Sequence, residues 1–140
     1  MAIHLNHTIV SARDRDSSAR FLSDILGLAS PETVEPFAIV QIGETSLDFV
    51  ETEEEIHPQH YAFLVTEAEF DAIFQRVKDR GFSYWADPYR RNEGQINMWD
   101  GGRGVYWDDP NGHLLEIITR PYGTGGTTTD NPHPLVAKIS

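Results

Sequence analysis

The chain of 140 residues is long enough for one domain with a substantial hydrophobic core. Its formal net charge of −11 argues against nucleic acid and anionic membranes as partners, and no apolar run approaches the ~18 residues of a membrane span. Because there is no cysteine, any transition-metal site must use histidine and carboxylate side chains. We therefore expect a small-molecule partner, and since the N-terminus lacks a signal-peptide pattern we expect a cytoplasmic protein.

The first half of the chain predicts a strand, a helix and a pair of strands, in that order. Alternation over residues 5–9 predicts the first strand, and apolar residues at helical spacing over 21–26 predict the helix. Gly27 stands where a glycine commonly ends a helix. Residues 37–42 and 46–50 predict two strands joined by a glycine-containing hairpin turn.

The second half repeats this order of elements and adds a less regular segment. Thr66 and Glu69 predict a capping box at the start of a helix that Gly81 ends. Residues 86–104 contain proline, glycine and arginine, and we expect them to be built on a hairpin. The stretches that predict strands in this half are 60–65, 82–85, 105–107 and 112–119.

The two halves of the chain indicate an internal duplication. Each half places a histidine on its first strand and reaches a helix-ending glycine 20 or 21 residues later. Aligning the halves puts His7 at the position of His60, and Asp48 at the position of Glu116. Four polar residues therefore occupy two pairs of equivalent positions.

Glu116 needs a partner, because the strand predicted at 112–119 is largely apolar on both faces. Burying an ionised carboxylate alone costs several kcal/mol, comparable with the net stability of a small domain. If the two halves packed their sheets together, their equivalent polar residues would converge on one concave surface. These residues are His7, His60, Asp48 and Glu116. Two imidazoles and a carboxylate on one side of an ion suit divalent iron or manganese, so the pattern predicts a metal site.

Each of these residues also has a simpler interpretation. A single histidine on an apolar strand face is more often a core residue than a ligand. Asp48 is equally well explained by a hydrogen bond to a backbone amide, and Glu116 by an ion pair with Arg103 or Arg120. The other histidines are expected at the surface or around the site, not as ligands; they are His4, His57, His113 and His133.

Several aromatic residues near the predicted site have two interpretations. Tyr106 precedes Glu116 by ten residues, and its phenol suits either a hydrogen bond to a metal-bound oxygen or packing in the core. Four other aromatic residues suit either the wall of a pocket for a planar substrate or ordinary packing in the core. They are Trp85, Tyr89, Trp99 and Trp107.

Three segments of the chain together resemble the vicinal oxygen chelate superfamily. They are Asn6-His7, 60–63 and 109–117. It contains glyoxalases, extradiol dioxygenases, fosfomycin-resistance enzymes and bleomycin-resistance proteins. The resemblance implies an α+β fold of paired βαβββ modules that form a half-barrel site. It also implies a divalent metal that binds two neighbouring substrate oxygens, and usually a homodimer.

The resemblance covers residues 5 to about 122 and sets the expected domain organisation. We expect a single domain over residues 1–122. Its first module spans about 3–52 and its second about 58–120. Residues 123–140, which are rich in Gly, Thr, Asn and Pro, are expected to form an irregular C-terminal tail.

The resemblance also assigns roles residue by residue. His7, His60 and Glu116 match the metal ligands of the extradiol dioxygenases and fosfomycin enzymes. Tyr106 matches their active-site tyrosine. Glyoxalases use four ligands, and Asp48 falls at the fourth position, with a shorter side chain than their glutamate.

Two departures speak against a fosfomycin enzyme. Ile9 stands where those enzymes have a threonine, and residues 100–104 lack their serine-rich cation loop. Within the superfamily the chain is most similar to the group around the chartreusin-pathway dioxygenase. Besides the strand at 60–63, the segments that carry this similarity are 46–49, 84–88 and 116–123.

The resemblance thus implies a metal-dependent oxygenase acting on a small aromatic or enolic substrate. Fe(II) is the expected metal, with Mn, Ni and Zn as alternatives and a flavin as a candidate co-substrate. Tyr106 would assist proton transfer, and Asp48 would lie beside the metal or act as a fourth ligand. Two other functions stay open: a glyoxalase-like isomerase or lyase with four metal ligands, and a bleomycin-resistance-type drug-binding protein without a metal.

Overall fold

The computed structural model describes residues 3–123 of the chain. These residues form two compact units, each of which is described by itself. Unit one takes its residues from 3–58 and 109–112, and unit two from 59–108 and 113–123. None of the helices in the described range is long and apolar enough to cross a membrane.

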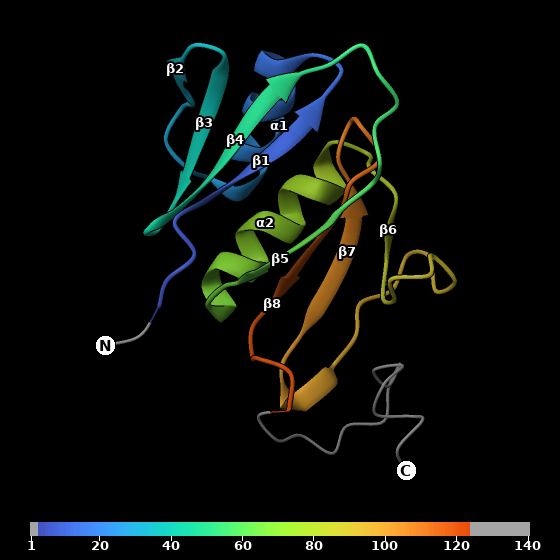
Figure 1. Cartoon of the computed structure of the whole chain (residues 1–140). Coiled ribbons are helices and arrows are strands. Elements are labelled where there is room, and N and C mark those ends of the chain that lie inside the picture. The colour runs from blue at the N-terminus through green and yellow to red at the C-terminus, as the bar shows by residue number, and fades with distance from the viewer. Residues whose placement is uncertain (1–2, 124–140) are drawn as a thin grey trace. The chain divides into compact units, whose positions relative to one another are not determined.

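Unit one contains one helix and a four-stranded sheet (Figure 1). Its elements are β1 (His7–Ala12), α1 (Arg15–Leu26), β2 (Glu32–Val34), β3 (Phe37–Ile42) and β4 (Thr45–Glu51). The strand order is β1-β4-β3-β2, with β1 parallel to β4 and the other pairs antiparallel. This is a βαβββ module.

Unit two repeats the same arrangement. Its elements are β5 (His60–Leu64), α2 (Glu67–Asp79), β6 (Tyr84–Trp85), the short 3₁₀ helix η1 (Trp99–Gly101), β7 (Gly104–Asp108) and β8 (Leu114–Ile118). The strand order is β5-β8-β7-β6, and again only the first pair is parallel. The expected α+β fold of paired βαβββ modules is therefore confirmed.

Local capping interactions fix where both helices begin and where α1 ends. The carboxylate of Asp14 accepts a hydrogen bond from the backbone N of Ser17 at 3.0 Å, and Gly27 ends α1 in the left-handed conformation at φ 72°. Thr66 and Glu69 exchange side-chain to backbone hydrogen bonds at the start of α2. The capping box and the helix-ending glycine that the sequence predicts are thus confirmed.

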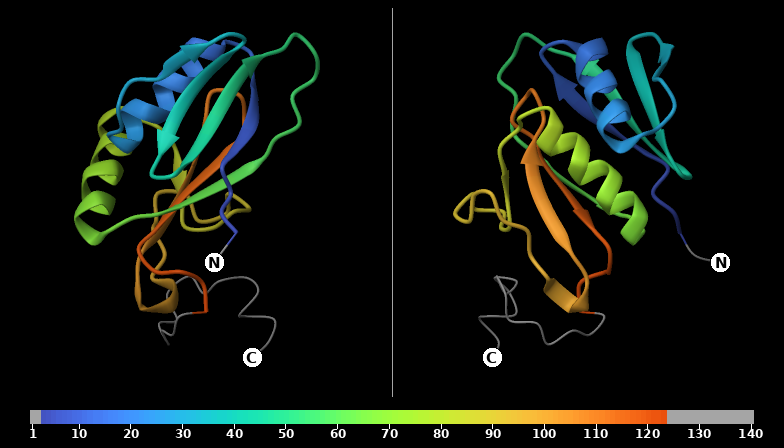
Figure 2. Two further views of the ribbon diagram at one scale, coloured as in Figure 1. Left: turned by 60° about the vertical axis from the view of Figure 1, so that its left-hand side comes forward. Right: turned by 180° about the vertical axis from the view of Figure 1, so that it is seen from behind.

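Each helix covers one face of the sheet in its own unit (Figure 2). In unit two the ring of Phe74 on α2 lies 5.0 Å from that of Tyr84, which is paired with Trp107 across β6 and β7. The side chains that fill this core share that face of the sheet or the buried face of α2; they are Phe70, Ile73, Val77, Val105, Trp107, Leu115 and Ile117. Side chains of opposite parity therefore point to the face away from the helix.

The irregular segment at 86–104 has the antiparallel pairing of the expected hairpin as isolated bridges around a compact turn. The carboxylate of Asp87 accepts hydrogen bonds from the backbone N of Tyr89, Arg91 and Asn92, at 3.1, 3.0 and 2.8 Å. These amides are consequently used in a compact turn and are not available for a strand ladder. Antiparallel bridges join Trp85 to Glu93 and Asn97 to Gly104, and η1 lies between the second pair.

Three further points concern an additional strand, the C-terminal tail and the domain organisation. The structure contains β2, a short strand of three exposed residues that the sequence analysis did not predict. The expected C-terminal tail lies, from residue 124 on, outside the described residues, as does His133. The single domain over residues 1–122 stays a prediction.

Candidate metal centre

The strand register of unit two places several of the predicted site residues in one row. Glu116 on β8 is paired with Ala62 on β5 and with Tyr106 on β7. Tyr106 is in turn paired with Trp85 on β6. Directly paired residues point to the same face of a sheet, so these side chains lie on the face away from α2. His60 lies two residues before Ala62 and shares that face.

His60 and Glu116 contact each other directly. The Nε2 atom of His60 lies 3.0 Å from Oε1 of Glu116, and its Nδ1 atom lies 3.0 Å from the carbonyl oxygen of Leu114. Because a carbonyl oxygen only accepts, Nδ1 carries a hydrogen, and the neutral ring directs the lone pair of Nε2 at the carboxylate. Two acceptors that face each other need a cation or a proton between them.

This donor set fits a divalent metal ion. In metal-binding histidines the N–H of the other ring nitrogen usually donates a hydrogen bond to a carbonyl or carboxylate, as Nδ1–H of His60 does to Leu114, and this leaves Nε2 for the metal. Glu116 is fully buried, so its charge has little solvent to stabilise it. The hydrogen bond to Glu116 also raises the pKa of His60, so the carboxylate favours a positive charge at this position.

Two tyrosines complete the surroundings of the Glu116 carboxylate. The hydroxyl of Tyr122 donates a hydrogen bond to Oε2 of Glu116. The hydroxyl of Tyr106 lies 3.0 Å from that of Tyr122 and donates to it, because Tyr122 has used its own hydrogen. Burial, followed by the charge of Glu116, raises the pKa of both tyrosines, so both stay protonated donors.

Aromatic rings surround this polar cluster. The ring of Trp99 lies 6.1 Å from that of Tyr106 and 6.1 Å from that of Tyr122, in edge contacts. The ring of His60 stacks on that of Tyr106, with centroids 5.8 Å apart. Glu116 itself has no exposed surface in this environment, which strengthens the electrostatic interactions of its carboxylate.

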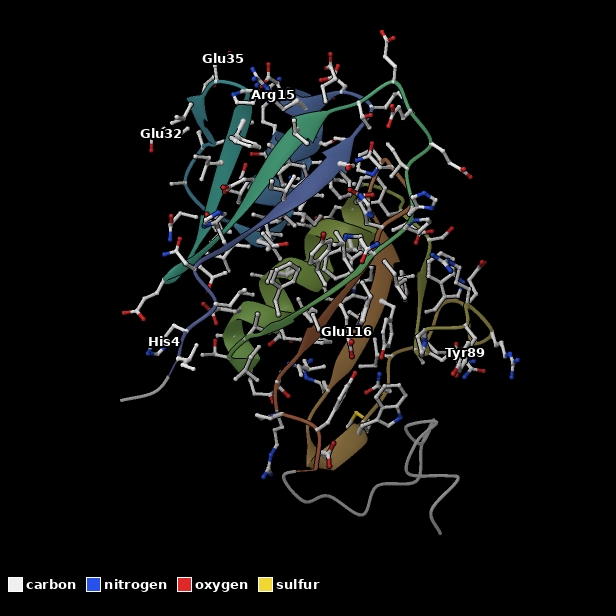
Figure 3. The ribbon with its side chains drawn as sticks, viewed as in Figure 1. His4, Arg15, Glu32, Glu35, Tyr89 and Glu116 are labelled. Carbon is white, nitrogen blue, oxygen red and sulfur yellow. The ribbon has the colours of Figure 1, made fainter. Side chains whose placement is uncertain are left out.

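The four aromatic residues predicted to bind substrate lie in different places. Trp85 lies beside Tyr106 on the site face, and Trp99 touches Tyr106. Trp107 is fully buried on the opposite face of β7, towards α2. Tyr89 is 58% exposed on the loop after β6 and lies away from Glu116 (Figure 3). The structure therefore brings two of the four to the site.

The other two predicted polar residues share one face of the sheet in unit one. His7 on β1 is paired with Ser46 on β4, and Asp48 lies two residues beyond Ser46. In unit two His60 is paired with Leu114, and Glu116 lies two residues beyond it. The two units thus have the same register, as the duplication predicts.

The hydrogen bonds of His7 and Asp48 are local. The Nδ1 atom of His7 lies 2.8 Å from the amide oxygen of Asn6, an arrangement that leaves Nε2 with its lone pair. Asp48 accepts a hydrogen bond of 2.8 Å from the hydroxyl of Ser46. Across residues 3–123, no three His, Asp or Glu side chains form a group that could hold a metal ion. The pair His60–Glu116 is therefore the largest part of the predicted ligand set found within one unit.

Comparison with known proteins places this geometry in a family. A family model described as the Glyoxalase/Bleomycin resistance protein/Dioxygenase superfamily matches residues 4–117. The chain belongs to this superfamily. Two solved structures, titled Oxidase ChaP-H1 and Oxidase ChaP-H2, are 61% and 57% identical to the chain. The first covers 87% of this chain and 99% of its own with a TM-score of 0.85, and the second 90% and 100% with a TM-score of 0.87.

More distant members of the superfamily have other reactions in their names. Glutathione transferase FosA of Serratia marcescens is 29% identical over 120 residues, which are 81% of this chain and 78% of that protein. Metallothiol transferase FosB of Shouchella clausii is 28% identical over 121 residues, which are 82% and 79% of the two chains. The family and these relatives support a metal-dependent enzyme, and the resemblance to the group around the chartreusin-pathway dioxygenase is confirmed.

Two residues near the site were not assigned their places from the sequence. Tyr122 lies beyond the end of β8, where strand parity no longer predicts its direction; the only signal was that the closing segment 116–123 resembles that of the superfamily. His113, expected at the surface or around the site, is buried at 1% exposure. Its Nδ1 accepts a hydrogen bond of 3.0 Å from the backbone N of Gln59, which gives it a structural role.

Proposed function

We propose that the protein is a ferrous-iron-dependent oxygenase of the extradiol-dioxygenase kind. Its substrate would be a small aromatic or enolic molecule held through two neighbouring oxygen atoms. The observation that carries the proposal is the pair of acceptors, Nε2 of His60 and Oε1 of Glu116, that face each other at 3.0 Å. The oxidase titles of two relatives that are 57–61% identical to this chain support the oxidative reaction over the other reactions of the superfamily.

His7 would complete the metal-binding residues, from the same chain or from a second copy in a homodimer. Its Nδ1 is held by Asn6, so its Nε2 has the same freedom to bind a metal as that of His60. Imidazole and carboxylate donors without thiolate suit Fe(II), and also Mn, Ni and Zn. Bound iron would supply the redox chemistry and the positive charge that attracts substrate oxygens.

The remaining residues of the site would orient the substrate and handle its protons. The phenol of Tyr106, whose raised pKa keeps it protonated, donates to Tyr122 in this structure and would turn to donate its hydrogen bond to a substrate oxygen when substrate is bound. Trp85 and Trp99 would form a wall for a planar ring, with Tyr89 at the rim, while Trp107 would support the wall from the opposite face of β7. Reduced flavin is proposed as a co-substrate.

A second candidate function is a glyoxalase-like isomerase or lyase. It is favoured by the equivalent registers of Asp48 and Glu116, which offer a second carboxylate as a fourth ligand or a base. Under the oxygenase proposal Asp48 would instead lie outside the ligand set and handle a proton of the substrate. A third reading, a drug-binding protein of the bleomycin-resistance kind, requires no metal at all.

Oxygen consumption separates these candidates. The protein is loaded with Fe(II) under anaerobic conditions. It is then mixed, in the presence of oxygen, with catechols, hydroquinones or polycyclic phenols, with and without reduced flavin. The proposal predicts substrate-dependent oxygen uptake that disappears when Glu116 is replaced by Ala. No uptake with any of these substrates, together with turnover of hemithioacetals by the nickel or zinc form, would establish the isomerase instead. Unchanged drug binding after loss of the metal would favour the third reading.

A further inference from the structure

The two oxygens of the Glu116 carboxylate have different partners. Oε1 faces the Nε2 lone pair of His60 at 3.0 Å, which is the proposed metal position. Oε2 accepts the hydrogen bond donated by the hydroxyl of Tyr122. A carboxylate whose second oxygen accepts a strong hydrogen bond has less negative charge available there for a metal.

Contacts outside the metal centre hold Tyr122 in this position. Its ring lies against that of Trp99, with centroids 6.1 Å apart and an interplanar angle of 60°. The backbone N of the next residue, Gly123, donates a hydrogen bond of 3.0 Å to Asp100 in η1. Tyr106 donates to the Tyr122 oxygen from the other side. Although Tyr122 as a whole is 43% exposed, its hydroxyl is therefore aimed inward by the fold.

We infer that Tyr122 is a positioning residue that restricts Glu116 to binding the metal through one oxygen. The inference rests on the proposed function, because it takes the metal to lie between His60 and Glu116. Carboxylates bind divalent ions through either one or two oxygens. When Oε2 is held by Tyr122, only Oε1 is free to bind.

The consequence concerns the open side of the metal. Two histidines and one carboxylate oxygen leave coordination positions free for substrate and dioxygen. A carboxylate that binds through both oxygens fills one of these positions. Tyr122 would thus preserve a coordination position that a substrate bound through two oxygens and a dioxygen molecule both require.

The test uses Mn(II) as the probe and counts the water molecules bound to it. Water-proton relaxation is measured at full Mn(II) occupancy in the parent and in Tyr122→Phe, which keeps the ring against Trp99. We expect the variant to hold about one water fewer, because Oε2 replaces a water on the metal. Visible absorption of the Co(II) form should independently report the same change in coordination.

Two matched variants remove a different phenol. Tyr106→Phe removes one of the contacts that hold Tyr122 but leaves the hydrogen bond that Tyr122 itself donates to Glu116, so it should lower the water count less than Tyr122→Phe does. Tyr84→Phe changes a tyrosine that packs against Phe74 on the helix-facing side, and should change neither the water count nor the Mn(II) affinity. A structural effect of losing any phenol would change all three variants alike.

The water count and the Mn(II) affinity distinguish a failure of the inference from a failure of the proposed function. Equal water counts for the parent and Tyr122→Phe, with one Mn(II) bound by each, would overturn the inference alone. If the parent binds no more Mn(II) than Glu116→Ala, the proposed function fails and the inference with it. Should Tyr122→Phe not fold, Asp100→Ala removes the anchor of Gly123 and should lower the water count in the same direction; an unchanged count would again overturn the inference.

Discussion

The two units have the same topology and register, yet they satisfy their equivalent polar residues in different ways. In unit two His60 and Glu116 contact each other. In unit one His7 and Asp48 are each bonded to a residue nearby in the sequence. A duplicated framework has therefore kept the positions of the polar groups while changing their interactions.

The neighbours of the two acids explain the difference. On β7, the residue paired with Glu116 is Tyr106, and further aromatic rings surround it. On β3, the residue paired with Asp48 is Ile39. Unit two thus surrounds its buried acid with phenols, whereas unit one has an accessible imidazole and a shorter acid that is also buried. We expect substitutions in the two units to have unequal effects.

Glu116→Ala should have the largest effect. It removes one of the two facing acceptors, so the metal content should fall from about one ion per chain to near zero. Activity should fall by more than about 100-fold, because removing only a residue that hydrogen-bonds to a metal ligand already lowers metal affinity or activity by 10–100-fold. Metal analysis and oxygen uptake measure this. Glu44→Ala, in the exposed turn between β3 and β4, is the control and should behave like the parent.

The histidines sharpen the comparison between the units. His60→Ala removes the ring that faces Glu116, and His7→Ala removes the proposed ligand of unit one. Both should weaken Mn(II) binding by at least about 10-fold in a competition titration with a chelator. Parental affinity in His7→Ala alone would show that unit one contributes no ligand, and the site would have to be assigned to unit two.

Asp48→Asn separates the oxygenase from the isomerase. The amide keeps the shape of the side chain and its hydrogen bond with Ser46, but it has no charge. The oxygenase proposal predicts that metal affinity stays within about 3-fold of the parent, because Asp48 is not a ligand, while turnover falls by 10–100-fold. A loss of metal affinity as large as that of His60→Ala would favour four ligands.

The smallest expected effects concern the helix caps, which also differ between the units. Thr66→Ala should lower the free energy of unfolding by about 1 kcal/mol in a urea titration, whereas Thr66→Ser should keep the cap. In unit one the backbone hydrogen bond from Ser17 lowers the pKa of Asp14 below its usual value of 3.8.

The sign of the pH dependence follows from that lowered pKa. The ionised Asp14 contributes stability above pH 3.8, and this contribution is lost as the pH falls through the folded-state pKa. The destabilisation caused by Asp14→Ala should therefore shrink in acid, while that caused by Thr66→Ala should not follow this titration. Equal pH dependence of the two variants would contradict the proposed role of the Asp14 charge.

Much of the fold could be predicted because its signals are local. The capping box at Thr66, the glycine that ends α1 and the register shared by Asp48 and Glu116 depend on residues close in sequence or repeated between the halves. β2 gave no such signal, because its three residues are all exposed and show no alternation. The expected hairpin at 86–104 is present as isolated antiparallel bridges and not as longer strands, because the side chain of Asp87 captures three backbone amides.

The candidate site shows the same limit. Strand parity was enough to place Glu116, His60 and Tyr106 on one face of a sheet. The direction of Tyr122 depends instead on its packing against Trp99 and on the bond from Gly123 to Asp100, contacts between segments about 23 residues apart that no periodic pattern encodes.

Anomalous diffraction from crystals of the protein loaded with Mn(II) or Fe(II) tests the central claim most directly. The account predicts one metal ion per chain bonded to Nε2 of His60 and Oε1 of Glu116, with the imidazole of His7 as the third protein ligand and Oε2 still bonded to Tyr122. A fully loaded protein whose metal lies elsewhere, with His60 and Glu116 still in direct contact, would contradict it.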